Sequence, residues 1–119
     1  MKKILVVDDE ESVRIILKQM LEQGGYSAEV ASDGAEALDK LKADNYHMII
    51  TDINMPGMDG VELLKKSKEL FPKLPVIFVT GFGKDKIILQ AMKLGLSNYI
   101  EKPFKMDDVL KIVKDYISN

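Results

Sequence analysis

Side chains that could do chemistry stand at four separate places in the sequence, each at the end of a short apolar run. Two adjacent acids, Asp8 and Asp9, follow the first run, and Asp52 follows the third. The hydroxyl of Thr80 ends the fourth run, and Lys102 comes just after the fifth. If the runs are parallel strands, their carboxyl ends meet at one edge of a sheet. We therefore expect three carboxylates, one hydroxyl and one ammonium to lie together there.

This set of groups restricts the chemistry that the edge could support. Three close carboxylates repel one another and need a cation if all are to stay ionised. An oxygen-rich cluster without histidine or cysteine favours a hard metal, Mg²⁺ first, with Mn²⁺ as a substitute. A carboxylate can act as a nucleophile toward phosphorus, and a lysine and a hydroxyl can hold the other phosphoryl oxygens. The residues therefore predict metal-dependent phosphoryl transfer to an aspartate.

The elements that must position these groups alternate along the chain. Continuous apolar runs predict buried strands, and apolar residues at helical spacing between them predict amphipathic helices. Asp33 with Glu36, and Asp59 with Glu62, have the spacing of helix-capping boxes, and Pro56 with its neighbouring glycines predicts a loop. The expected strands are 4–7, 26–31, 48–51, 75–80 and 98–101, and the last helix is expected at about 106–117.

The order is therefore strand then helix, five times, in 119 residues. Such a chain forms a doubly wound α/β fold with one parallel five-stranded sheet. No linker or repeat interrupts the pattern, so we expect residues 1–119 to be one domain.

Composition excludes several other classes of protein. The chain has no cysteine, which rules out disulfides and thiolate metal sites and suits the cytoplasm. The net charge is −2 and the basic residues are scattered, which argues against direct nucleic-acid binding. No apolar run is long enough for a membrane span or a signal peptide.

Each residue also has an ordinary structural interpretation when it is taken alone. A single aspartate after a strand is more often a helix cap, and a single lysine is more often a solvated surface residue. Several such residues at one edge, in this order, make the separate interpretations improbable.

The motifs that carry these residues resemble the receiver domain of two-component response regulators, from Lys3 to about Ile117. The matching motifs are Val6-Val7-Asp8-Asp9-Glu10, Asp52-Ile53-Asn54-Met55-Pro56-Gly57-Met58-Asp59-Gly60, Thr80-Gly81 and Lys102-Pro103-Phe104. The resemblance implies a flavodoxin-like or CheY-like sheet with strand order 2-1-3-4-5.

The resemblance also implies a role for each position in the cluster. Asp52 corresponds to the phosphoacceptor and Asp9 to the direct acidic metal ligand, with Asp8 supporting the metal through water. The backbone carbonyl of Asn54 corresponds to a further metal ligand. Lys102 corresponds to the lysine that pairs with Asp52 and later with a phosphoryl oxygen.

A second group of positions corresponds to the switch of the family. Thr80 would move to bond the phosphoryl group, and Tyr99 would rotate inward as it does. The Lys102–Pro103 peptide bond would be cis and would aim Lys102 into the site. The sequence departs from the family pattern at Gly81, where alanine is more common. With Gly83 this predicts a mobile loop, and Phe82 would shield the acyl phosphate from water.

The expected partners follow from the same resemblance. The phosphodonor would be the phosphohistidine of a sensor histidine kinase or a histidine phosphotransfer protein, docked on the first helix and the loop after the fifth strand. The output surface would be the fourth helix, fifth strand and fifth helix. Its candidate contacts are Ile87, Leu89, Met106 and Ile112, of which Ile112 is the preferred one. His47 is expected at the opposite end of the sheet, as a surface or edge residue and not a relay histidine.

Three other interpretations are weaker. A phosphatase of the haloacid dehalogenase type has Asp-x-Asp after its first strand, whereas Asp8-Asp9 stands here. A nucleotide- or flavin-binding module needs a phosphate loop in the place of these acids. A receiver that has lost phosphorylation is disfavoured by the intact set of acid, hydroxyl and lysine. The sequence leaves open the cognate kinase, the output target, and whether this is a stand-alone receiver or one domain of a longer regulator.

Overall fold

The computed structural model describes residues 1–81 and 85–117, in which five strands alternate with five helices. The strands are β1 (Lys3–Val7), β2 (Ser27–Ala31), β3 (Met48–Asp52), β4 (Val76–Thr80) and β5 (Asn98–Glu101). The helices are α1 (Glu11–Gln23), α2 (Gly34–Ala43), α3 (Gly60–Leu70), α4 (Asp85–Lys93) and α5 (Met106–Tyr116).

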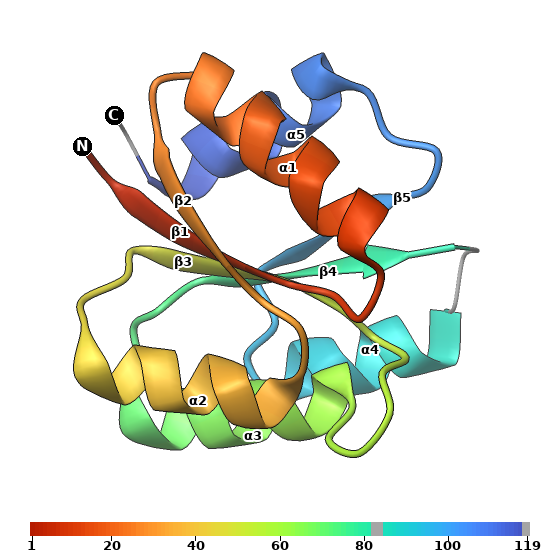
Figure 1. The fold of residues 1–119 in the computed structure, drawn as a ribbon. Coiled ribbons are helices and arrows are strands. Elements are labelled where there is room, and N and C mark those ends of the chain that lie inside the picture. The colour runs from red at the N-terminus through yellow and green to blue at the C-terminus, as the bar shows by residue number, and fades with distance from the viewer. Residues whose placement is uncertain (82–84, 118–119) are drawn as a thin grey trace.

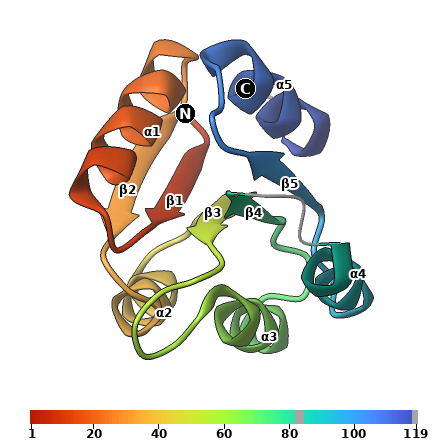
Figure 2. The same ribbon diagram turned by 90° about the vertical axis from the view of Figure 1, so that its right-hand side faces the viewer.

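All four strand pairs are parallel, and the strand order is β2-β1-β3-β4-β5. The predicted fold class and strand order are therefore confirmed. Figure 2 looks onto the carboxyl ends of the strands, where the connections to the following helices begin.

The sheet is the middle layer of three (Figure 1). Helices α1 and α5 cover one face, and α2, α3 and α4 cover the other. Alternate strand residues feed two apolar cores: Leu5 and Phe78 pack toward α2, α3 and α4, whereas Val6 and Ile77 pack toward α1 and α5. Burial on both faces explains why the strands are continuously apolar.

The predicted helix caps at Asp33 and Asp59 are present. The Asp33 carboxylate accepts a hydrogen bond from the Glu36 backbone N–H at 2.8 Å, and Glu36 accepts one from the Ser32 N–H at 2.7 Å. Asp59 caps α3 by accepting from the Glu62 N–H at 2.9 Å. These caps fix where α2 and α3 begin relative to the ends of β2 and β3.

Some expected boundaries were wrong by one residue. Tyr26 and Pro75 lie just outside β2 and β4, and Asp52 belongs to β3. Tyr26 is still buried in the core beside α1 and α5. In the described ranges, 1–81 and 85–117, no helix combines the length and apolarity that crossing a membrane requires.

Candidate functional site

Strand register brings the predicted residues to one edge of the sheet. Val7 pairs with Thr51, so Asp8 emerges beside Asp52. Asp52 pairs with Val79, and Thr80 pairs with Glu101, so Thr80 and Lys102 follow on the adjacent strands. One carboxylate oxygen from each of Asp8, Asp9 and Asp52 lies within 4.8 Å of the other two.

Asp8 is the most unusual of the three acids. Its side chain is buried, with only 1% of the residue exposed. One carboxylate oxygen, Oδ1, accepts a hydrogen bond from the Glu10 backbone N–H at 2.9 Å, but Oδ2 has no partner among the described residues. Burial raises the pKa of Asp8 to about 6, and the neighbouring acids add to that rise.

Asp52 is half-buried at the end of β3. Its Oδ1 accepts a hydrogen bond from the Ile53 backbone N–H at 2.9 Å. Burial raises the pKa of Asp52, whereas the charge of Lys102 and the backbone N–H groups of Ile53 and Asn54 oppose that rise. Asp9 and Asn54 are exposed, so the cluster opens to solvent on their side.

Lys102 acts on the acids through its charge. Its positive charge opposes the rise in the pKa of both Asp8 and Asp52, although no ion pair links it to either acid in the described part of the chain. Its backbone N–H donates to the Thr80 carbonyl at 2.8 Å, which ties β5 to β4 at the site. The Lys102–Pro103 bond is cis, as predicted.

The two predicted switch residues lie on neighbouring strands. Thr80 is buried at the end of β4, and Tyr99 is half-buried on β5, against the core toward α4. Phe78, not Thr80, is the register partner of Tyr99. The expectations for Phe82 and Gly83 fall outside the described residues.

Arg14 is a site residue that the sequence reasoning missed. Its guanidinium reaches back from α1 and donates a hydrogen bond to the Asp8 backbone carbonyl at 2.7 Å. It therefore holds the backbone from which Asp8 and Asp9 project. Its signal in the sequence was that it is the only arginine in the chain.

Gly60 brings the start of α3 against the backbone of Asp52. A Cβ at position 60 would lie 2.5 Å from the Asp52 carbonyl oxygen and 2.9 Å from Ile53 Cα. The Gly60 N–H also donates to the Ile53 carbonyl at 2.7 Å. The absence of a side chain therefore fixes how closely α3 supports Asp52.

The acid cluster fits a hard divalent cation. All of its side-chain donors are carboxylate oxygens, which is the donor type that Mg²⁺ and Mn²⁺ prefer. The buried Oδ2 of Asp8 lacks a hydrogen-bond donor, and a cation beside it would remove the cost of burying that charge.

Comparison with known proteins agrees with this arrangement. The family model of the response regulator receiver domain matches residues 4–114. The chain is 34% identical to sporulation initiation phosphotransferase F of Bacillus subtilis, over 98% of this chain and 94% of that protein. It is 36% identical to the DNA-binding transcriptional regulator NtrC of Escherichia coli, over 98% of this chain but only 25% of that protein.

Solved structures give the same result. The chemotaxis protein CheY4 of Vibrio cholerae superposes with a TM-score of 0.94 at 31% identity, covering 98% of this chain and 99% of that one. A response regulator receiver domain protein from Clostridium thermocellum has a TM-score of 0.93 at 32% identity, covering 98% of this chain and 94% of that one.

The fold and the cluster of acids at the carboxyl ends of the strands define a receiver-type α/β domain. The chain belongs to the response regulator receiver domain family of two-component signalling systems.

Proposed function

We propose that the chain receives a phosphoryl group on Asp52 from the phosphohistidine of a sensor histidine kinase or a histidine phosphotransfer protein. The observation that supports this most strongly is the buried Asp8 oxygen without a partner, beside Asp9 and Asp52. A purely structural acid cluster would be expected to satisfy that oxygen within the protein.

The proposed transfer is a displacement at phosphorus. An Asp52 oxygen attacks in line, a P–O bond forms, the P–N bond to the histidine breaks, and the imidazole leaves with that electron pair. Lys102 and the Thr80 hydroxyl then hold phosphoryl oxygens. A Mg²⁺ ion bound by Asp8, Asp9, Asp52 and the Asn54 carbonyl would offset the negative charge of the transferring group, and Mn²⁺ would substitute for it.

The same proposal assigns the readout to Thr80 and Tyr99. Thr80 moves toward the phosphoryl group, and Tyr99 takes an inward position, so the surface of α4, β5 and α5 changes its contacts. Leu89 on α4 is 61% exposed and is the best candidate contact on that surface. Ile112 on α5 is half-buried against the core and remains a candidate contact on the same surface.

The phosphodonor protein is proposed to dock on α1 and on the loop after β5. Helix α1 begins directly after the acid pair and exposes Ile15 and Ile16 by 49% and 45%. An Ile15→Ser variant should therefore slow transfer from a phosphohistidine protein without slowing transfer from a small phosphodonor. We also propose a cytoplasmic location, which suits a chain without cysteine.

The direct test is incubation with Mg²⁺ and acetyl phosphate, followed by intact-mass measurement. The wild-type protein should gain one phosphoryl group, Asp52→Ala should gain none, and Asp39→Ala should match the wild type because Asp39 is an exposed acid on α2. No gain in the wild type would favour a receiver that only docks. An equal gain in Asp52→Ala would place the acceptor elsewhere.

A further inference from the structure

Strand β2 forms one edge of the sheet, so one side of its backbone has no neighbouring strand. The strand order places β2 at the end, beside β1 only. Helices α1 and α2 flank it from opposite faces of the sheet (Figure 2). The free N–H and C=O groups of such an edge can pair with a strand of another molecule unless something covers them.

The hydrogen bonds between β1 and β2 identify the groups on the open side. The Ser27 N–H donates to the residue before β1 at 2.8 Å, and the Ala31 carbonyl accepts from the residue after β1 at 3.2 Å. In a ladder of this kind the backbone groups of successive residues point to opposite sides of the strand. Within β2, the N–H and C=O groups of Ala28 and Val30 therefore point outward.

Both outward carbonyls accept a hydrogen bond from a lysine. The Lys18 ammonium reaches from α1 and donates to the Ala28 carbonyl at 2.7 Å. The Lys40 ammonium reaches from α2 and donates to the Val30 carbonyl at 2.6 Å. Both lysines are half-buried. The edge is therefore covered from the two faces of the sheet, by one side chain for each outward carbonyl.

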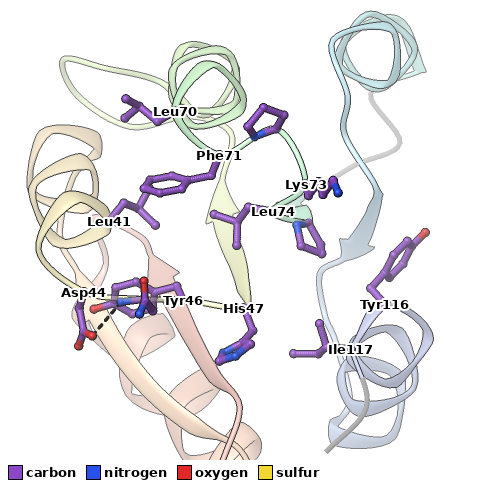
Figure 3. Close-up of a pocket in the computed structure, with 13 residues that line it drawn as sticks. Leu41, Asp44, Tyr46, His47, Leu70, Phe71, Lys73, Leu74, Tyr116 and Ile117 are labelled. Carbon is purple, nitrogen blue, oxygen red and sulfur yellow. Dashed lines mark hydrogen bonds between the residues drawn. The ribbon is translucent and has the colours of Figure 1, made fainter.

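The one charged side chain of β2 itself, Glu29, is engaged elsewhere. Its carboxylate accepts from the Tyr46 hydroxyl at 3.0 Å and pairs with the Lys3 ammonium at 3.3 Å. Lys3 lies on the neighbouring strand β1, and Tyr46 borders the hollow at the amino ends of the strands (Figure 3). The ammonium groups that an incoming strand would meet are those of Lys18 and Lys40.

We propose that Lys18 and Lys40 close the β2 edge to a second copy of this chain. A second copy fits this edge, because antiparallel pairing of two β2 strands would set Ala28 of each copy opposite Val30 of the other. Every outward N–H would then meet an outward carbonyl, but only after the lysines had left those carbonyls. The closure leaves association to the opposite side of the sheet, where β5 lies, and does not depend on phosphorylation.

The test is sedimentation equilibrium of the unphosphorylated chain and of its Lys18→Met/Lys40→Met variant. Methionine keeps an unbranched side chain of similar length but has no group that donates to a carbonyl. The double variant should self-associate at least about tenfold more tightly than the wild type, because its outward carbonyls are free to pair. Amide hydrogen exchange at Ala28 and Val30 should slow as the double variant is concentrated, but not as the wild type is.

Two control variants separate the edge from a general effect of charge. Lys42→Met/Lys65→Met makes the same change of charge at exposed lysines of α2 and α3, and should behave as the wild type. Adding Val30→Pro to Lys18→Met/Lys40→Met should restore the monomer, because proline removes an outward N–H that β1 does not use. Amide spectra check that each variant is folded. If the methionine variant does not fold, Lys18→Gln/Lys40→Gln takes its place.

Three outcomes would overturn the proposal. A folded double variant that associates no more tightly than the wild type would show that the lysines do not close the edge. Self-association that persists with Val30→Pro, or that appears equally in Lys42→Met/Lys65→Met, would place the contact on another surface. A wild-type dimer with slowed exchange at Ala28 and Val30 would show that the edge is open with the lysines present.

Discussion

The two ends of strand β1 handle charge in opposite ways. At its start, the Lys3 ammonium pairs with Glu29 at 3.3 Å and with Asp44, and it lies 5.3 Å from the centre of the Tyr46 ring. The Tyr46 hydroxyl donates to Glu29 at 3.0 Å. Just past the other end, Asp8 is buried with one carboxylate oxygen unpartnered, and the nearest charges include two more acids.

The contrast separates a structural network from a binding site. The charges at the amino end satisfy one another, so that end needs no ligand to be stable. The acids at the carboxyl end raise one another's energy and are held together by the fold. Functional sites commonly keep an unfavourable arrangement of charges of this kind.

The largest effect is expected from crowding the carboxyl end at Gly60. Gly60→Ala should lower the free energy of unfolding by about 2–3 kcal/mol, because the new Cβ meets backbone atoms of Asp52 and Ile53 that cannot move aside. Urea unfolding measures the change, and a loss of Mg²⁺ affinity should accompany it, since Asp52 is displaced.

Gly34→Ala is the matched control for this prediction. Gly34 also begins a helix, α2, but the three atoms nearest to a Cβ there all belong to the side chain of Met58, the closest at 2.8 Å. Met58 is flexible and half-buried, and alanine favours the helix, so the change should stay within about 1 kcal/mol. Equal losses in the two variants would refute the idea that backbone contact at Asp52 makes Gly60 special.

The second-largest effect is expected from replacing Asp8, whose Oδ2 has no hydrogen-bond partner among the described residues. Asp8→Asn should raise the free energy of unfolding at pH 7 without divalent metal by about 1–3 kcal/mol, because it removes a buried charge. The same substitution should weaken Mg²⁺ binding. Mg²⁺ should therefore raise the melting temperature of the wild type but hardly that of the variant. A destabilised Asp8→Asn protein would show that the carboxylate is structural.

Asp8 also determines how the free energy of unfolding changes with pH. Its pKa is about 6 in the folded protein and near 3.8 ordinarily, so the folded state binds the proton more tightly between these values. The contribution of Asp8 to stability is fully present below about pH 4 and is lost as the pH rises through about 6. Unfolding measured from pH 4 to 7 without metal should show this slope in the wild type, and Asp8→Asn should lack it.

The sequence predicted the fold and the carboxyl end well because both depend on local signals. Apolar runs, capping pairs such as Asp33 with Glu36, and acids placed directly after strands each act over a few residues. The register of the parallel strands then places these acids side by side at one edge of the sheet. The same is true of Asp52, which only had to stand at the carboxyl end of β3.

The features that were missed depend on contacts between distant segments. Lys3 and Glu29 lie on β1 and β2 and Asp44 just follows α2, and no sequence motif marks the network that they form. Arg14 bonds to a backbone carbonyl six positions earlier, so only its uniqueness could have marked it.

The smallest change in stability is expected at the start of β1, where the charges are paired. Lys3→Met should lower stability less than Gly60→Ala does, since its ion pairs lie at a surface where water competes for the charges. The double-mutant cycle of Lys3→Met with Glu29→Gln isolates the pair. Its coupling energy should be favourable and should shrink as salt is raised from 0.05 to about 0.5 M, because salt screens exposed charges.

Asp8→Asn should keep its stabilising effect over the same range, because a buried charge is screened much less. If salt weakened both effects equally, the two ends would not differ in burial of charge, and the comparison between them would fail.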